Sequence, residues 1–112
     1  MAVYKLNLIP QKAIINVSCS QNDHLFDRIW QFELYNGHDK ANVTSGSAVS
    51  MVASNGKTLN ALSVSGNVVT FKPTSTFTEK PGRYKAKIFI ADGENRLFSS
   101  SFNLWVEGLN GN

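Results

Sequence analysis

Two histidines lie next to acidic residues and are the first candidates for general-base or metal-binding chemistry. His24 follows Asp23, and His38 precedes Asp39. Both pairs lie in polar segments with the composition of turns, and neither belongs to a helical His-Glu-x-x-His pattern or to a compact ligand cluster. Because loop residues are usually exposed and a site here would need distant loops to converge, we predict solvated turn residues, with no metal and no cofactor.

The candidate nucleophiles are one serine and the single cysteine. Ser54 and Lys57 have the Ser-x-x-Lys spacing of serine acyl enzymes, but Asn55-Gly56 between them is typical of a tight turn, and the companion motifs are missing from the sequence. Cys19 ends an apolar run, and a single cysteine can form neither an internal disulfide nor a Cys-x-x-Cys pair. No nucleophile elbow, phosphate loop or dinucleotide fingerprint occurs either, so the sequence predicts that the protein is not an enzyme.

A row of cations is a stronger signal, and it points to binding. Arg83, Lys85 and Lys87 alternate along one segment and would project from one face of a strand. Such a row could meet an acidic partner or a phosphate backbone, although a charged outer face also simply keeps a strand soluble. Apart from Phe89 at its end, the row has no aromatic platform for single-stranded nucleic acid. We therefore rank a solvated face first, a protein docking site second and nucleic acid third.

Large apolar residues occupy other positions that should face water. Ile29 and Tyr35 lie on the polar face of one segment, Phe89 shares the lysine face, and Leu97 and Trp105 share a serine-rich face. Singly these are ordinary surface residues, but adjoining ones would form a patch suited to protein association. The candidate interface residues are therefore Ile29, Tyr35, Arg83, Lys85, Lys87, Phe89, Leu97 and Trp105.

The elements that must position these residues have the pattern of β-strands. Apolar and polar residues alternate with period two, and Gly, Asn, Asp and Pro interrupt the alternation about every 8 to 12 residues, which is typical of an antiparallel sandwich or barrel. The expected strands are 3–8, 13–18, 27–35, 48–53, 62–64, 68–72, 83–91 and 97–107, and 74–81 is an expected loop.

The last two strands should form a hairpin around Asp92-Gly93-Glu94-Asn95. The alternation then assigns an inner face to Trp30, Phe32, Leu34, Val69, Phe71, Tyr84, Ile88, Ile90, Phe98, Phe102 and Leu104. We expect an all-β fold, an antiparallel β-sandwich of roughly immunoglobulin-like architecture.

Length and composition agree with one packed domain. The chain has 112 residues, of which 42% are hydrophobic and 17% charged, with a net charge of +3 that is too small to imply nucleic acid without a localised basic face. The start has no signal-peptide pattern, and no apolar run reaches the roughly 18 residues of a membrane helix, so we expect production in a reducing cytoplasm and no membrane insertion. We expect the sandwich over 1–107 and a linker over 108–112.

An ordered series of segments carries a resemblance to a known family. The segments are Lys12-Ala13-Ile14-Ile15, Arg28-Ile29-Trp30-Gln31-Phe32-Glu33-Leu34 with Asn36-Gly37, Asn67-Val68-Val69-Thr70-Phe71, Pro81-Gly82-Arg83-Tyr84-Lys85-Ala86-Lys87-Ile88 and Phe98-Ser99-Ser100-Ser101-Phe102. In order and spacing they resemble the N-terminal domain of phage baseplate upper proteins, from about Tyr4 to Val106.

The resemblance implies a structural adaptor in a phage or prophage tail baseplate. In that family the domain is a β-sandwich that fastens the host-adhesion apparatus to the central baseplate. The implied partners are the distal tail protein, further copies of the chain and a receptor-binding protein, within an oligomeric assembly of the virion. The family's helical linker and distal domain are not in this sequence, where Gly108-Leu109-Asn110-Gly111-Asn112 follows Glu107. The resemblance carries over no catalytic or metal residues. The alternative function is a carbohydrate-binding sandwich, with Trp105 or Tyr35 lining a glycan groove.

Overall fold

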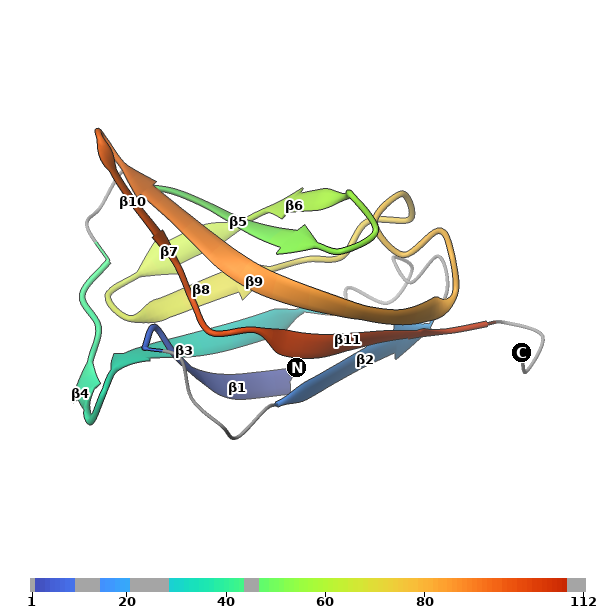
Figure 1. Ribbon diagram of the computed structural model, residues 1–112, viewed down its shortest axis with the longest axis horizontal. Helices are drawn as coiled ribbons and strands as arrows, with labels where there is room; N and C mark the ends of the chain where they lie inside the picture. The colour runs from blue at the N-terminus through green and yellow to red at the C-terminus, as the bar shows by residue number, and fades with distance from the viewer. Residues whose placement is uncertain (1, 10–14, 21–28, 44–46, 109–112) are drawn as a thin grey trace.

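The computed structural model describes residues 2–9, 15–20, 29–43 and 47–108, and these form eleven strands and no helix (Figure 1). The strands are β1 (Ala2–Asn7), β2 (Asn16–Ser20), β3 (Trp30–Asn36), β4 (Asp39–Lys40), β5 (Ala48–Ala53), β6 (Thr58–Asn60), β7 (Ser63–Ser65), β8 (Val68–Phe71), β9 (Gly82–Asp92), β10 (Asn95–Phe98) and β11 (Phe102–Glu107). The predicted all-β fold is confirmed.

The strands make two sheets that pack face to face. Sheet A has the order β1-β3-β8-β7, with β4 beside β3, and sheet B has the order β2-β11-β9-β5-β6, with β10 beside β9. In Figure 1 sheet B lies in front of sheet A. Most pairs are antiparallel, as predicted, but β1 with β3 and β2 with β11 are parallel. The alternation of side chains could not reveal this, because it fixes which way side chains point and not the direction of the neighbouring strand.

Phe32 of β3 lies at the centre of the core between the sheets. Its ring centroid lies 5.4 Å from that of Tyr4, 5.8 Å from Phe71 and 5.2 Å from Phe102. Trp30, Phe32 and Leu34 are at most 1% exposed. This burial confirms the predicted alternation in β3. Because Phe32 of sheet A packs against Phe102 of sheet B, the opposite face of each sheet is its outer face.

The predicted hairpin between β9 and β10 is present, but the segment after it departs from the prediction. A single strand over 97–107 would put Phe98 inside with Phe102 and Leu97 outside with Trp105. Instead Phe98 pairs with Phe89 and is 51% exposed, whereas Leu97 pairs with the buried Ile90. Leu97 itself stays 44% exposed.

A β-bulge explains this correction. Between the pairs Phe98–Phe89 and Phe102–Ala86, the three residues 99–101 lie opposite only two residues of β9, 87 and 88. An extra residue reverses which way the following side chains point. The Ser99 hydroxyl accepts a hydrogen bond from the Ile88 N–H (2.9 Å), and the Ser99 N–H donates to the Ile88 carbonyl (2.8 Å). The serine side chain thus takes the place of a backbone acceptor where the ladder is interrupted.

The remaining differences are small. Strands β4 and β6 have only two and three residues, too few to show an alternating pattern. Tyr84 points as predicted but is only partly buried, and its hydroxyl donates to the Lys80 carbonyl (2.9 Å). None of the described residues belongs to a helix that is long and apolar enough to cross a bilayer.

Candidate functional site

The residues considered for catalysis do not assemble into a site within the part of the chain that the structure describes. His38 is exposed in the turn between β3 and β4, and Asp39 is exposed at the start of β4, while Asp23 and His24 lie outside the described residues. Across ranges 2–9, 15–20, 29–43 and 47–108, no group of three or more His, Cys, Asp and Glu side chains could hold a metal ion. Cys19 is buried.

The Ser-x-x-Lys pair spans the turn between β5 and β6, and its two side chains have separate partners. The Ser54 hydroxyl accepts a hydrogen bond from the Lys85 backbone N–H (3.1 Å). Lys57 Nζ donates to Glu79 Oε2 (2.8 Å), an ion pair that ties the loop after β8 to this turn. This hydrogen bond and the positive charge of Lys57 lower the pKa of Glu79. In the described structure each of the two side chains is therefore bonded to a different residue.

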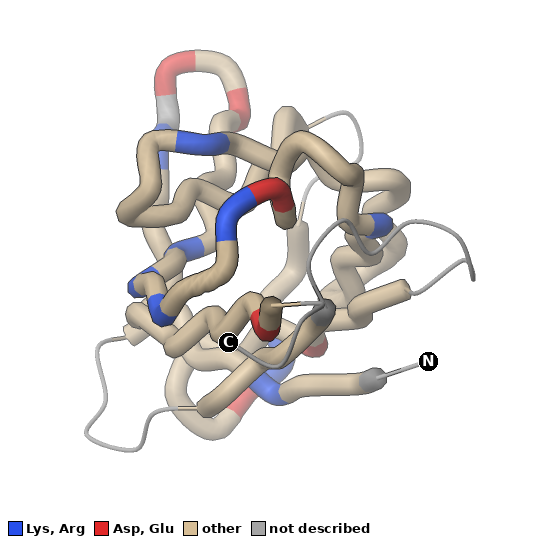
Figure 2. Tube along the Cα trace, turned by 90° about the vertical axis from the view of Figure 1, so that its right-hand side faces the viewer, with Lys and Arg blue, Asp and Glu red and all other residues tan. Residues whose placement is uncertain are grey.

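The outward face of sheet B carries five of the predicted interface residues and one that was missed. We call this surface the basic face and define it by Arg83, Lys85, Lys87, Phe89, Phe98 and Trp105. The three cations lie on β9, which is the middle strand of sheet B and therefore has neighbours on both sides. Figure 2 shows Lys and Arg positions gathering along the left-hand side of the view, where sheet B lies.

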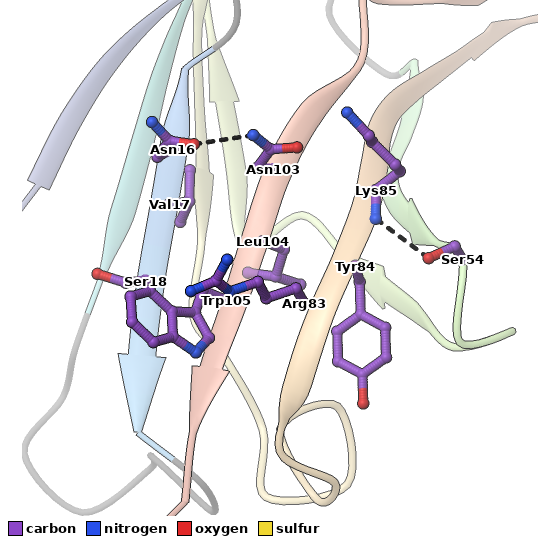
Figure 3. A pocket seen from close by; sticks show the side chains of 10 residues that line it. All are labelled: Asn16, Val17, Ser18, Ser54, Arg83, Tyr84, Lys85, Asn103, Leu104 and Trp105. Carbon is purple, nitrogen blue, oxygen red and sulfur yellow. Dashed lines mark hydrogen bonds between the residues drawn. The ribbon is translucent and has the colours of Figure 1, made fainter. Parts of the chain in front are cut away.

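At one end of the basic face, Arg83 covers an exposed indole. Trp105 pairs directly with Arg83 across the β9–β11 ladder and is 43% exposed. The guanidinium carbon lies 4.7 Å from the indole ring centroid, within the range of a cation–π contact, and Figure 3 shows the arginine reaching across β11. The contact holds both side chains in place and leaves an aromatic surface open to a partner.

The other end of the basic face is a pair of phenylalanines. The rings of Phe89 and Phe98 lie 4.8 Å apart, and Lys87 Nζ lies 5.9 Å from the Phe98 ring centroid. Val52, which pairs with Lys87 from β5, is 37% exposed. Phe98 was missed because the bulge that turns it outward depends on three serines with no special pattern.

Lys85 is the middle cation of the basic face, and it pairs with Asn103 beside a groove with a volume of about 670 Å³. Asn103 Nδ2 donates a hydrogen bond to Asn16 Oδ1 (2.9 Å) from the neighbouring strand β2 (Figure 3). The groove is lined by Asn16, Val17, Ser18, Ser54, Arg83, Tyr84, Lys85, Asn103, Leu104 and Trp105. Its lining therefore combines polar side chains with the aromatic rings of Tyr84 and Trp105.

Within the described strands, the residues that pair with these cations carry no charge. Arg83, Lys85 and Lys87 pair across the ladder with Trp105, Asn103 and Val52 respectively, all of them uncharged. Among the described side chains, none of the three cations takes part in an ion pair. The positive charge of the basic face is thus available to a partner.

The other predicted interface residues lie elsewhere. Tyr35 lies on β3 in sheet A, and Ile29 directly precedes that strand. The Tyr35 hydroxyl donates to Glu33 (3.2 Å), and Lys5 Nζ lies 6.0 Å from the tyrosine ring centroid. Leu97 points to the same side as Ile90, away from the basic face. The eight predicted residues therefore do not form one patch.

Comparison with known proteins gives the fold independent support. No family model matches the chain, and no curated protein has a matching sequence. Among solved structures, the N-terminal domain of phage TP901-1 ORF48 is similar, with a TM-score of 0.71 and 11% sequence identity over 96% of this chain and 99% of that one. The similarity covers both sheets, and the chain shares the fold of this phage domain.

Proposed function

We propose that this chain is a structural domain of a phage or prophage tail baseplate, which attaches the host-adhesion apparatus to the central baseplate through protein–protein contacts. The observation that carries the proposal is the fold shared with a phage protein domain over nearly the whole chain. The order and spacing of the segments that resemble baseplate upper proteins also support it. The proposed partners are the distal tail protein and further copies of the chain, in the virion.

The basic face is the proposed docking surface. Two packed sheets hold its backbone in place, so that a partner orders only the ends of exposed side chains on binding. Trp105 and Phe98 supply half-exposed aromatic surface of the kind that dominates binding energy in protein interfaces. The cations steer an oppositely charged partner and fix its orientation. This role requires no catalysis.

Co-expression with the products of the neighbouring tail genes, followed by co-purification, tests the adaptor role. The wild-type chain is expected to retain a tail protein, and Trp105→Ala to weaken that retention without unfolding the domain. Tyr35→Ala is the matched control, because it removes a partly exposed aromatic ring from sheet A instead. Failure of the wild-type chain to retain any of these proteins would refute the adaptor role, and equal retention by both variants would remove Trp105 from the interface.

The second candidate is carbohydrate binding in the groove beside Trp105. The Asn103–Asn16 hydrogen bond uses one donor and one acceptor, which leaves Asn103 Oδ1 and Asn16 Nδ2 to meet sugar hydroxyls. The part of the Trp105 ring that Arg83 leaves exposed would provide the aromatic surface on which a sugar ring packs. Binding of the isolated chain on a glycan array, lost in Trp105→Ala and Asn103→Ala, would favour this function over the adaptor.

A further inference from the structure

We infer that the basic face docks an extended acidic segment of a neighbouring protein, with carboxylates at every second position and apolar side chains at both ends. The inference rests on the proposed function for the nature of the partner as a tail protein, and it adds the chemistry of the segment that is recognised. Three features of β9 and its neighbours support it: the spacing of the cations, their lack of acidic partners and the position of the exposed aromatic rings.

The spacing of the cations matches that of a second extended chain. Arg83, Lys85 and Lys87 are two residues apart on a continuous strand, so successive side chains repeat about every 6.6–6.8 Å. Alternate residues of an extended partner repeat at the same interval. Three carboxylates on such a segment can therefore each face one cation, without bending either backbone.

The charge of the basic face specifies an acidic partner. None of the three cations has an ion-pair partner among the described residues, and their neighbours in the ladder are uncharged. A segment bearing carboxylates would neutralise them, whereas a basic or neutral segment would leave three buried charges without partners, which is costly.

The exposed rings favour a protein over a nucleic acid. Trp105 beside Arg83 and the Phe89–Phe98 pair stand at opposite ends of the row, separated by about 20 Å along β9. One ring of each site is about half exposed, Trp105 at 43% and Phe98 at 51%. Arg83 already packs over the indole of Trp105 and so occupies a ring face on which a base would stack. Apolar side chains that flank a row of carboxylates would bury against both ends.

A synthetic peptide tests the inference directly. The probe has glutamate at every second position between two terminal leucines and threonine elsewhere, and the control peptide has the same composition with its glutamates adjacent. Both are titrated into the ¹⁵N-labelled full chain at low salt, and amide shifts are followed by NMR. Shifts are expected from Arg83 to Phe89 and at Trp105 and Phe98, and they should decrease with added salt.

Matched lysine variants complete the test. Lys85→Gln with Lys87→Gln is expected to weaken binding of the alternating peptide roughly three- to tenfold, since each exposed ion pair contributes little. Lys5→Gln with Lys40→Gln removes the same charge from sheet A and is expected to leave binding unchanged. Equal effects of the two double variants would overturn the inference.

Three other results would also overturn it: no shift on the basic face, equal binding of the control peptide, or tighter binding of an oligothymidylate of the same charge. The proposed function is tested separately by co-purification. If tail proteins are retained but the peptide does not bind, only the acidic-segment inference fails. If the peptide binds but no tail protein is retained, the adaptor role fails and the recognition chemistry stands.

Discussion

Two phenylalanines four residues apart should differ sharply in their contribution to stability, because the bulge at Ser99–Ser101 puts them on opposite faces of sheet B. Phe102 is fully buried and packs 5.2 Å from Phe32, so Phe102→Ala removes a whole ring from the core and leaves a cavity. Such a change costs about 3–5 kcal/mol. Phe98 is 51% exposed, so Phe98→Ala loses about half the transfer free energy of a phenylalanine and leaves no cavity, which costs about 1 kcal/mol.

Urea unfolding followed by tryptophan fluorescence measures both costs, provided that the slope of the transition stays constant among the variants. Phe102→Leu serves if Phe102→Ala does not fold, and it should cost about 1–1.5 kcal/mol, since it keeps an apolar side chain in place. A continuous strand over 97–107 would place both rings inside and make the two alanine variants equally unstable. Equal costs would therefore refute the bulge and the outward position of Phe98.

Three further predictions concern local structure. Ser99→Ala should destabilise the domain by about 1–3 kcal/mol in urea unfolding, because the Ile88 N–H loses its acceptor inside the sheet; an unchanged midpoint would refute the role of this hydroxyl. Lys57→Met should raise the pKa of Glu79 toward its ordinary value of 4.5, as measured by carboxyl NMR. Because the pKa of Glu79 is lowered in the folded chain, the ion pair stabilises the fold above pH 4.5, and this stabilisation is lost as the pH falls through the folded pKa. Gly93→Ala should lower the free energy of unfolding by about 1–2 kcal/mol, because the backbone at Gly93 has a positive φ of 62°. Gly93→Asn should lower it less, since asparagine tolerates this conformation, and equal losses in urea unfolding would contradict this explanation.

Much of the fold follows from the alternation of side chains in the sequence. The inner residues of β3, β8 and β9 could be assigned because one face of each strand is buried, and Trp30, Phe71 and Ile88 show the expected burial. Strand partners could not be assigned in the same way, since pairing between distant segments depends on the whole sandwich. The parallel pairing of β1 with β3 is an example.

The candidate site was predictable where it lies on one strand and unpredictable where it spans several. Arg83, Lys85 and Lys87 share a face because they alternate within β9, which the sequence displays directly. Phe98 joins them only through a bulge, and Tyr35 lies apart from them in the other sheet. Neither fact depends on residue type alone.

Hydroxyl-radical footprinting of the chain in complex with the tail protein that co-purifies with it tests the central claim most directly. The method reports the solvent exposure of individual aromatic side chains. We predict that oxidation of Trp105 and Phe98 falls on complex formation while that of Tyr35 does not change. Protection of Tyr35 with Trp105 and Phe98 still oxidised at the rate of the free chain would contradict the assignment of the basic face as the docking surface.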